Sequence, residues 1–242
     1  MNLSMITARD RLIVAMDLST LESINEAVVK IGDAVSYYKI GMESFYSLGE
    51  TALELMAANR KKVFLDLKLH DIPNTVARSV KSLCRLAPVM TTIHAAGGPS
   101  MLRAAVEAAA DASSQLGLPR PKLLGITVLT SINDSEWAAV GHTAPIRDSV
   151  LRLAELCKIN GMDGVVASPQ EAAAIRQCCG PDFLIVTPGI RPVYGDKGDQ
   201  SRTATPAQAL RDGADYLVVG RPILAAADPR TAAVEIVKEM EG

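Results

Sequence analysis

The segment from residue 64 to residue 71 carries the densest set of groups capable of electrostatic and acid–base chemistry. Asp66, Lys68 and His70 alternate with leucines, and Asp71 follows them directly. Side chains of a β-strand point alternately to its two faces, so Asp66 and Lys68 should share one face, about 7 Å apart along the strand. A paired carboxylate and ammonium group can stabilise a developing charge and transfer a proton.

Charges on a core strand need partners, because burying an unpaired charge costs several kcal/mol. Two other apolar segments end in such charges, Asp17 and Lys39. We expect Asp17, Lys39, Asp66 and Lys68 to form an alternating cluster in which the carboxylates favour the cationic form of Lys68. An ion-pair network that only closes the end of the fold is the alternative interpretation.

Short β-rich segments alternate with longer amphipathic segments along the chain. Strict alternation implies parallel strands with right-handed crossovers. Eight such units in 242 residues favour a TIM (β/α)8 barrel, an α/β fold, with residues 1–242 as a single domain. No Gly-x-Gly-x-x-Gly follows the first strand, which argues against a dinucleotide-binding fold. The predicted strands are Leu12–Asp17, Tyr37–Gly41, Lys62–His70, Val89–His94, Lys122–Leu129, Gly164–Ala167, Phe183–Thr187 and Tyr216–Val219.

The predicted helices lie between these strands and after the last one. Asp228 and Pro229 have the residue types of a helix cap and a first-turn proline. The helices are expected at Leu21–Ile31, Thr51–Ala58, Val76–Leu86, Met101–Leu116, Ile146–Lys158, Glu171–Cys178, Pro206–Arg211 and Thr231–Met240.

The active site of such a barrel lies at the carboxyl ends of its strands. Polar residues occupy this position on most of the predicted strands, which would gather many of them at one mouth of the barrel. They are Asp17, Lys39, the Asp66–Asp71 segment, His94, Thr130, Ser131, Ser168, Arg191 and Arg221.

The loops after strands seven and eight have the composition of a phosphate site. Arg191 and Gln200 lie in a polar, glycine-containing loop, and Gly220 and Arg221 follow strand eight. Backbone amides near Gly220, a helix N-terminus and the forked Arg221 cation could together hold an oxyanion. The alternative for each arginine alone is an ordinary position on a solvated loop. Two arginines after these two strands favour a phosphorylated substrate.

Composition excludes several other classes of protein. Apolar residues make up 48% of the chain and the net charge is −2, so neither nucleic acid nor an acidic membrane is an expected partner. No apolar run is long enough to span a bilayer, and the first residues lack the pattern of a signal peptide. The four cysteines form no Cys-x-x-Cys pair, so disulfides and structural zinc are not expected. A cytoplasmic location is the resulting expectation.

The assembled residues resemble the orotidine 5′-phosphate decarboxylase family over essentially the whole chain. The Asp-x-Lys-x-x-Asp core is shared with a wider group of barrels, whereas the extended string from Phe64 to Thr75 is more specific. The matching segments are Tyr38-Lys39-Ile40-Gly41, Phe64–Thr75, Val128-Leu129-Thr130-Ser131, Thr187–Arg191, Gly198-Asp199-Gln200 and Val219-Gly220-Arg221.

The resemblance implies roles for these residues. Lys68 would protonate carbon six of the pyrimidine, and Asp66 would lie beside the substrate's carboxyl group. Asp71 and Thr75 would reach the neighbouring subunit's site, which implies a homodimer. Asp17 and Lys39 would contact ribose hydroxyls. The remaining implied contacts are Thr130 and Ser131 at ribose and base, Pro188 near the leaving carboxylate, and Arg191, Gln200, Gly220 and Arg221 at the phosphate.

The implied reaction converts orotidine 5′-phosphate to UMP and carbon dioxide, the last step of de novo UMP synthesis, without metal or organic cofactor. Two alternatives stay open. One is a related Mg²⁺-dependent sugar-phosphate decarboxylase or aldolase, although Lys39 occupies the position where those barrels offer a carboxylate to the metal. The other is a barrel that binds a phosphorylated ligand without catalysis.

Overall fold

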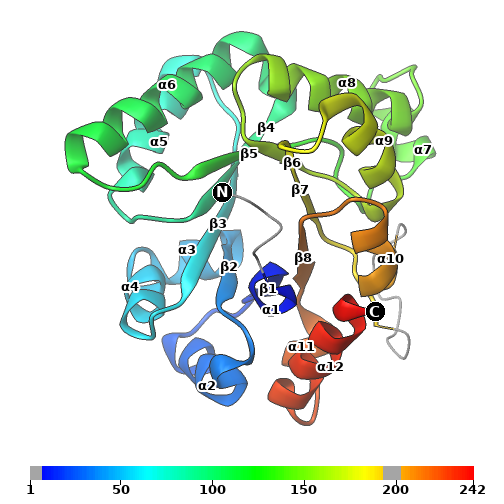
Figure 1. The fold of residues 1–242 in the computed structure, drawn as a ribbon. Coiled ribbons are helices and arrows are strands. Elements are labelled where there is room, and N and C mark those ends of the chain that lie inside the picture. The colour runs from blue at the N-terminus through cyan, green and yellow to red at the C-terminus, as the bar shows by residue number, and fades with distance from the viewer. Residues whose placement is uncertain (1–6, 193–202) are drawn as a thin grey trace.

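The chain folds into a closed barrel of eight parallel strands that pair in sequence order, with β8 next to β1. The computed structural model describes residues 7–192 and 203–242. Figure 1 shows the helices arranged around the outside of the strands. The predicted single-domain (β/α)8 fold is confirmed. The strands are β1 (Leu12–Ala15), β2 (Tyr37–Gly41), β3 (Lys62–Leu69), β4 (Met90–His94), β5 (Lys122–Ile126), β6 (Gly164–Val166), β7 (Leu184–Thr187) and β8 (Tyr216–Val219).

The main helices follow the predicted pattern closely. The helices that start two or three residues earlier than predicted all have proline in one of their first two positions, where it leaves no N–H unpaired and its φ already suits a helix. The helix after β3 thus begins at Pro73, one turn before the predicted Val76. The main helices are α2 (Leu21–Ile31), α4 (Thr51–Ala58), α5 (Pro73–Cys84), α6 (Gly98–Leu116), α8 (Ile146–Ile159), α9 (Pro169–Cys179), α10 (Pro206–Arg211) and α12 (Pro229–Glu241).

The short helices α1, α3 and α7 were not predicted, because so few turns rarely show a clear helical period. One of them had a recognisable start: Asn133 caps α7, and Glu136 completes a reciprocal capping box. Arg221, expected directly after strand eight, is the first residue of the short helix α11. The short elements are α1 (Ala8–Arg11), α3 (Met42–Leu48), α7 (Asp134–Ala139), α11 (Arg221–Leu224) and the 3₁₀ turns η2 (Gly32–Ala34) and η3 (Ala95–Gly97).

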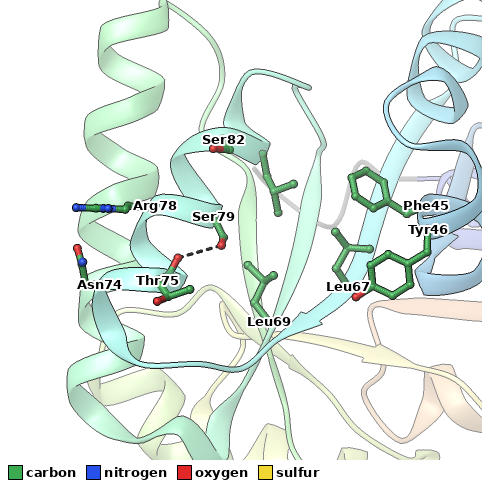
Figure 2. A pocket seen from close by; sticks show the side chains of 10 residues that line it. Phe45, Tyr46, Leu67, Leu69, Asn74, Thr75, Arg78, Ser79 and Ser82 are labelled. Carbon is green, nitrogen blue, oxygen red and sulfur yellow. Dashed lines mark hydrogen bonds between the residues drawn. The ribbon is translucent and has the colours of Figure 1, made fainter.

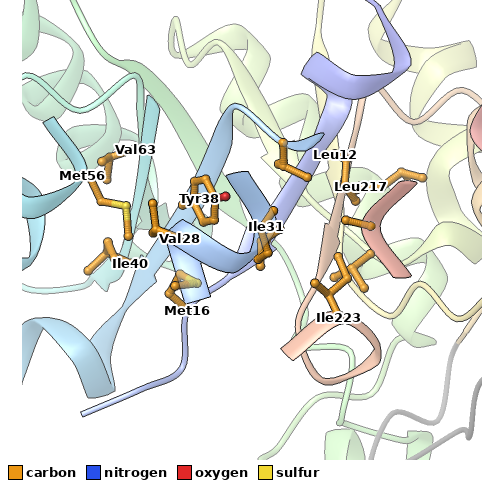
Figure 3. Packing of buried hydrophobic residues seen from close by; sticks show 14 of the residues in the cluster. Leu12, Met16, Val28, Ile31, Tyr38, Ile40, Met56, Val63, Leu217 and Ile223 are labelled. Atoms are coloured by element: carbon orange, nitrogen blue, oxygen red, sulfur yellow. The ribbon is translucent and has the colours of Figure 1, made fainter. Parts of the chain in front are cut away.

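Strand alternation divides the apolar residues into a barrel interior and an outer layer. Ile13, Phe64 and Met90 belong to the interior cluster. Two further clusters fill the space between strands and helices, one beside β1–β3 and β8 and one beside β4–β7. Figure 3 shows part of the first, with Tyr38 and Leu217 among its members. The polar end of the barrel therefore rests on a packed core.

Within residues 7–192 and 203–242, no helix combines the length and apolar character needed to cross a bilayer.

Candidate active site

Four charged side chains meet at the carboxyl ends of β1, β2 and β3. Lys68 Nζ lies 2.9 Å from Asp66 Oδ2, and Lys39 Nζ lies 3.6 Å from the same oxygen. Lys39 Nζ also lies 3.1 Å from Asp17 Oδ1. These distances confirm that the four side chains form the predicted cluster of alternating anions and cations. Lys39 and Asp66 are largely buried, with side chains 13% and 10% exposed.

Strand β3 is not regular where it carries these charges. Pairing with β4 shifts between Leu65 and Leu69, and Lys68 has a φ of +52°. A positive φ is uncommon for a residue with a long side chain and costs about 1–3 kcal/mol. The bulge redirects Lys68 so that its ammonium group approaches Asp66, two residues before it on the same strand. The predicted shared face is correct, and the irregular backbone brings the two charged groups into contact.

The neighbourhood of Asp17 and Lys39 depends on a glycine. A Cβ on Gly41 would lie 2.9 Å from Lys39 Nζ and 3.4 Å from Asp17 Oδ1, so a side chain there would displace the ion pair. The buried Ser44 hydroxyl donates to the Met16 carbonyl, which fixes the chain just before Asp17. Lys39 therefore reaches Asp17 and Asp66 past Gly41, and a side chain at Gly41 would require its ammonium group to shift.

Thr92, on β4, contacts the bulge directly. Its hydroxyl donates to Asp66 Oδ1 at 2.9 Å and accepts from the Lys68 backbone amide at 2.9 Å. A role for Thr92 was not predicted from the sequence. The sequence does place Thr92 two positions from both Met90 and His94, on the strand face that Met90 turns to the barrel interior.

The electrostatics of the cluster favour an ionised Asp66. Burial alone would raise its pKa, but Lys39, Lys68 and the hydrogen bonds from Lys68 and Thr92 outweigh burial and lower the pKa below its ordinary value. His94 behaves differently: burial, followed by the charges of His70 and Lys68, lowers its pKa. The rings of His70 and His94 lie 5.1 Å apart between centroids. An anion flanked by two ammonium groups is thus set beside an imidazole that is mostly neutral near pH 7.

A cavity of about 300 Å³ opens beside the cluster. Its charged wall is formed by Lys39, Asp66 and Lys68. Thr130, Ser131 and Pro188 also line this cavity, so six of the predicted site residues surround the same space. The opposite walls are apolar and consist of Phe64, Ile126, Val128, Leu129, Val166 and Val218. Low polarity around a few charges strengthens their interaction with a bound ligand.

Three of the four predicted phosphate residues, Arg191, Gly220 and Arg221, lie at the ends of β7 and β8, outside the lining of that cavity. Ile190 forms a short parallel bridge with Ala204, and the Arg191 amide donates to the Ala204 carbonyl at 3.0 Å. This bridge joins the chain just after β7 to the segment that leads into α10. Gly220 borders the charge cluster, because a Cβ there would lie 3.9 Å from Asp17 Oδ2. Arg221 begins α11. Gln200 lies outside the described residues.

Asp71 and Thr75 do not join the cavity. Asp71 is exposed, and its carboxylate accepts from the Ile72 amide at 2.6 Å. Thr75 lies in the first turn of α5 and lines a different, outer cavity of about 530 Å³. Figure 2 shows this cavity between α5, with Thr75 and Arg78, and the aromatic rings of Phe45 and Tyr46. Within a single chain, Asp71 and Thr75 therefore lie outside the cavity that the charge cluster lines.

Within the described ranges, no three histidine, cysteine, aspartate or glutamate side chains gather as a possible metal-binding group. Fold and site together define a (β/α)8 barrel with an aspartate–lysine cluster facing a small, largely apolar cavity.

Comparison with known proteins specifies the family. Residues 10–236 match the model of the orotidine 5′-phosphate decarboxylase / HUMPS family. The chain therefore belongs to this family. It is 46% identical over 235 residues to an orotidine 5′-phosphate decarboxylase of Moorella thermoacetica, covering 97% of this chain and 93% of the relative. A namesake from Carboxydothermus hydrogenoformans is 49% identical over 233 residues, 96% of this chain and 97% of the relative.

Solved structures agree with this assignment. The crystal structure of orotidine 5′-phosphate decarboxylase from Lactobacillus acidophilus is similar with a TM-score of 0.85 and 41% identity, over 96% of this chain and all of the other. An uncharacterized conserved protein from Geobacillus kaustophilus matches with a TM-score of 0.83 and 35% identity, over 95% and 99% of the two chains.

Proposed function

We propose that this chain decarboxylates orotidine 5′-phosphate to UMP and carbon dioxide in pyrimidine biosynthesis, with Lys68 as the proton donor. Relatives named for this activity match nearly the full chain, which supports the overall reaction. The contact of Lys68 with Asp66 at the wall of the cavity is the observation that carries the mechanism.

Bond breaking in this reaction leaves an electron pair on carbon six of the pyrimidine as carbon dioxide departs. A positive charge near that carbon stabilises the developing carbanion, and the Lys68 ammonium group then supplies the proton. Asp66 holds the Lys68 ammonium group at the cavity wall through their ion pair and lies beside the departing carboxylate, where repulsion adds a secondary contribution. The apolar walls reduce competing solvation, and Pro188 packs near the leaving group.

The other contacts follow the positions of the side chains. Asp17 and Lys39 bind ribose hydroxyls, and Thr130 with Ser131 contact ribose and base. The phosphate is assigned to the ends of β7 and β8, where Arg191, Gly220 and Arg221 lie, together with Gln200. Binding energy from the phosphate stabilises the reactive complex at a distance from the reacting carbon.

The proposal includes a homodimer in which Asp71 and Thr75 complete the partner's site. Their position outside the 300 Å³ cavity supports a contribution to another chain. Large apolar side chains are exposed nearby, Tyr46 at 74% beside the outer cavity and Ile72 at 66% next to Asp71. Burying such side chains is what stabilises a dimer interface.

Mixing two inactive variants tests the shared site. Lys68→Ala and Asp71→Ala dimers, exchanged together, should produce mixed dimers with one intact site. Recovery of roughly a quarter of the wild-type sites is expected at equal mixing. A mixture as inactive as its components would rule out sites shared between subunits.

A cytoplasmic location completes the proposal. All four cysteines are free thiols, which supports a reducing compartment.

Turnover of orotidine 5′-phosphate, followed by its absorbance, tests the activity. Wild type should consume the substrate, Lys68→Ala should lose nearly all activity, and Lys30→Ala, on the exposed face of α2, should behave as wild type. An inactive wild type would favour the non-catalytic phosphate-binding alternative. Near-normal turnover by Lys68→Ala would refute the assigned proton donor.

A further inference from the structure

The bulge in β3 faces a single residue of β4. The two strands pair at Leu65 and again at Leu69, whereas β4 advances only from Thr91 to Ile93 between these pairs. Thr92 is the β4 residue in between, and it is fully buried. Three β3 residues, two of them charged, therefore lie across from one threonine.

The Thr92 hydroxyl satisfies both charged residues at once. Its oxygen accepts from the backbone amide of Lys68, and its hydrogen is donated to Asp66 Oδ1, each at 2.9 Å. An amide can only donate and an ionised carboxylate can only accept, so the direction of both hydrogen bonds is fixed. The other carboxylate oxygen, Oδ2, already contacts the ammonium groups of Lys68 and Lys39.

We propose that Thr92 is a positioning residue of the decarboxylation site, whose hydroxyl fixes the Asp66 carboxylate and the backbone of Lys68 relative to each other. The inference rests on the proposed role of Lys68. The unfavourable φ of Lys68 needs compensation from its surroundings, and the Thr92 hydrogen bond replaces a strand contact at that point. Thr92 acts on the reaction through its two neighbours and not through the substrate.

The pH dependence of this arrangement follows from the groups around Asp66. Lys39 approaches from β2, Lys68 from β3, and Thr92 and His94 from β4. Removing the Thr92 hydroxyl takes away one of the hydrogen bonds that lower the pKa of Asp66. The pKa of Asp66 then rises, and activity should begin to fall at a higher pH on the acid side.

Two substitutions on the same strand provide the test. Thr92→Val keeps the shape and removes both hydrogen bonds, while Thr92→Ser keeps the hydroxyl. Thr91→Val is the matched control, because the Thr91 hydroxyl is buried without a hydrogen-bond partner in the described residues. Thr92→Val should lower kcat about 10- to 100-fold with a smaller change in KM, since displaced reacting groups slow chemistry more than binding.

The acid limb of the kcat/KM profile separates positioning from simple loss of stability. It should move to higher pH in Thr92→Val and return in Thr92→Ser, whereas Thr91→Val should match wild type in rate and profile. Wild-type kcat and profile in a folded Thr92→Val would overturn the proposal. So would a rate loss with an unshifted profile and no recovery in Thr92→Ser.

Two complications are covered by further measurements. If Thr92→Val does not fold, Thr92→Ala compared with Thr92→Ser decides by the same criteria. If wild type does not decarboxylate the substrate, the proposed function fails on its own. NMR titration of the Asp66 carboxyl group then still shows whether the Thr92 hydroxyl lowers its pKa, and an unchanged titration in Thr92→Val would overturn the inference.

Discussion

Lys39 Nζ, from β2, lies 3.6 Å from Asp66 Oδ2, on β3. The contact arises because the two strands are neighbours in the barrel and pair with Gly41 opposite Asp66. Since Lys68 contacts the same oxygen, Asp66 faces two ammonium groups. The Asp66 carboxylate thereby links the end of β2 to the bulge of β3, and removing either cation should change its pKa and the stability of the fold.

Lys39→Met should destabilise the protein in a pH-dependent way. The lowered pKa of Asp66 gives stability that is present above its unfolded value of about 3.9 and is lost as pH falls through the folded value. Without Lys39 that folded pKa is higher. The variant should lose about 1–3 kcal/mol of unfolding free energy near pH 7. Denaturant unfolding at several pH values should show the difference shrinking below about pH 4.

Lys30→Met is the control for this series, because Lys30 is exposed and pairs with Glu26 on the same helix. Its effect should stay within about 0.5 kcal/mol at every pH. A Lys39→Met deficit that does not vary with pH would show that the cation acts through packing and not through Asp66.

Gly164→Ala should destabilise the barrel without involving the active site. A Cβ at this position would lie 2.3 Å from the Leu184 carbonyl oxygen, where β6 pairs with β7. The strands must move apart to accommodate it, at a cost of about 1–3 kcal/mol. Thermal or denaturant unfolding measures this loss. A variant as stable as wild type would mean that the two strands do not approach so closely.

Gly220→Ala should, in contrast, leave stability unchanged and weaken substrate binding. The nearest atom to its new Cβ would be Ala15 Cβ at 3.4 Å, an ordinary contact, so stability should stay within about 0.5 kcal/mol of wild type. Backbone approach to the substrate phosphate would be obstructed, which should raise KM. An unchanged KM would argue against phosphate binding at the end of β8.

Arg221→Ala tests the same site through charge. Loss of a charge-assisted hydrogen bond is worth about 1.5–3 kcal/mol, so kcat/KM should fall about 10- to 100-fold. Inorganic phosphate should compete with substrate in wild type and compete more weakly in the variant. Equal inhibition by phosphate in both proteins would place its binding elsewhere.

Activity should be unaffected by removal of divalent cations. Lys39 occupies the strand-two position at the cavity wall, where its positive charge opposes binding of Mg²⁺. Rates before and after dialysis against EDTA measure this. Loss of turnover with EDTA and its return with Mg²⁺ would instead favour the metal-dependent sugar-phosphate alternative.

Strand order, barrel class and the membership of the charge cluster could be predicted from the sequence. Apolar alternation identifies each strand, and parallel strands in a barrel place their carboxyl ends together. Asp17, Lys39, Asp66 and Lys68 each end or interrupt an apolar strand, so their meeting followed from these rules alone. The short helices α1 and α3 could not be predicted, because they contain too few residues to show a helical period.

Only the tertiary structure decided how the charges touch. The local sequence does not indicate the positive φ of Lys68 or the register shift beside it, because both depend on which β4 residues lie opposite β3. Thr92 supplies those contacts from a strand whose pairing is not local. The string from Asp66 to Asp71 specifies the chemical groups, while packing between strands places Asp66 and Lys68 in the cavity and leaves Asp71 outside it.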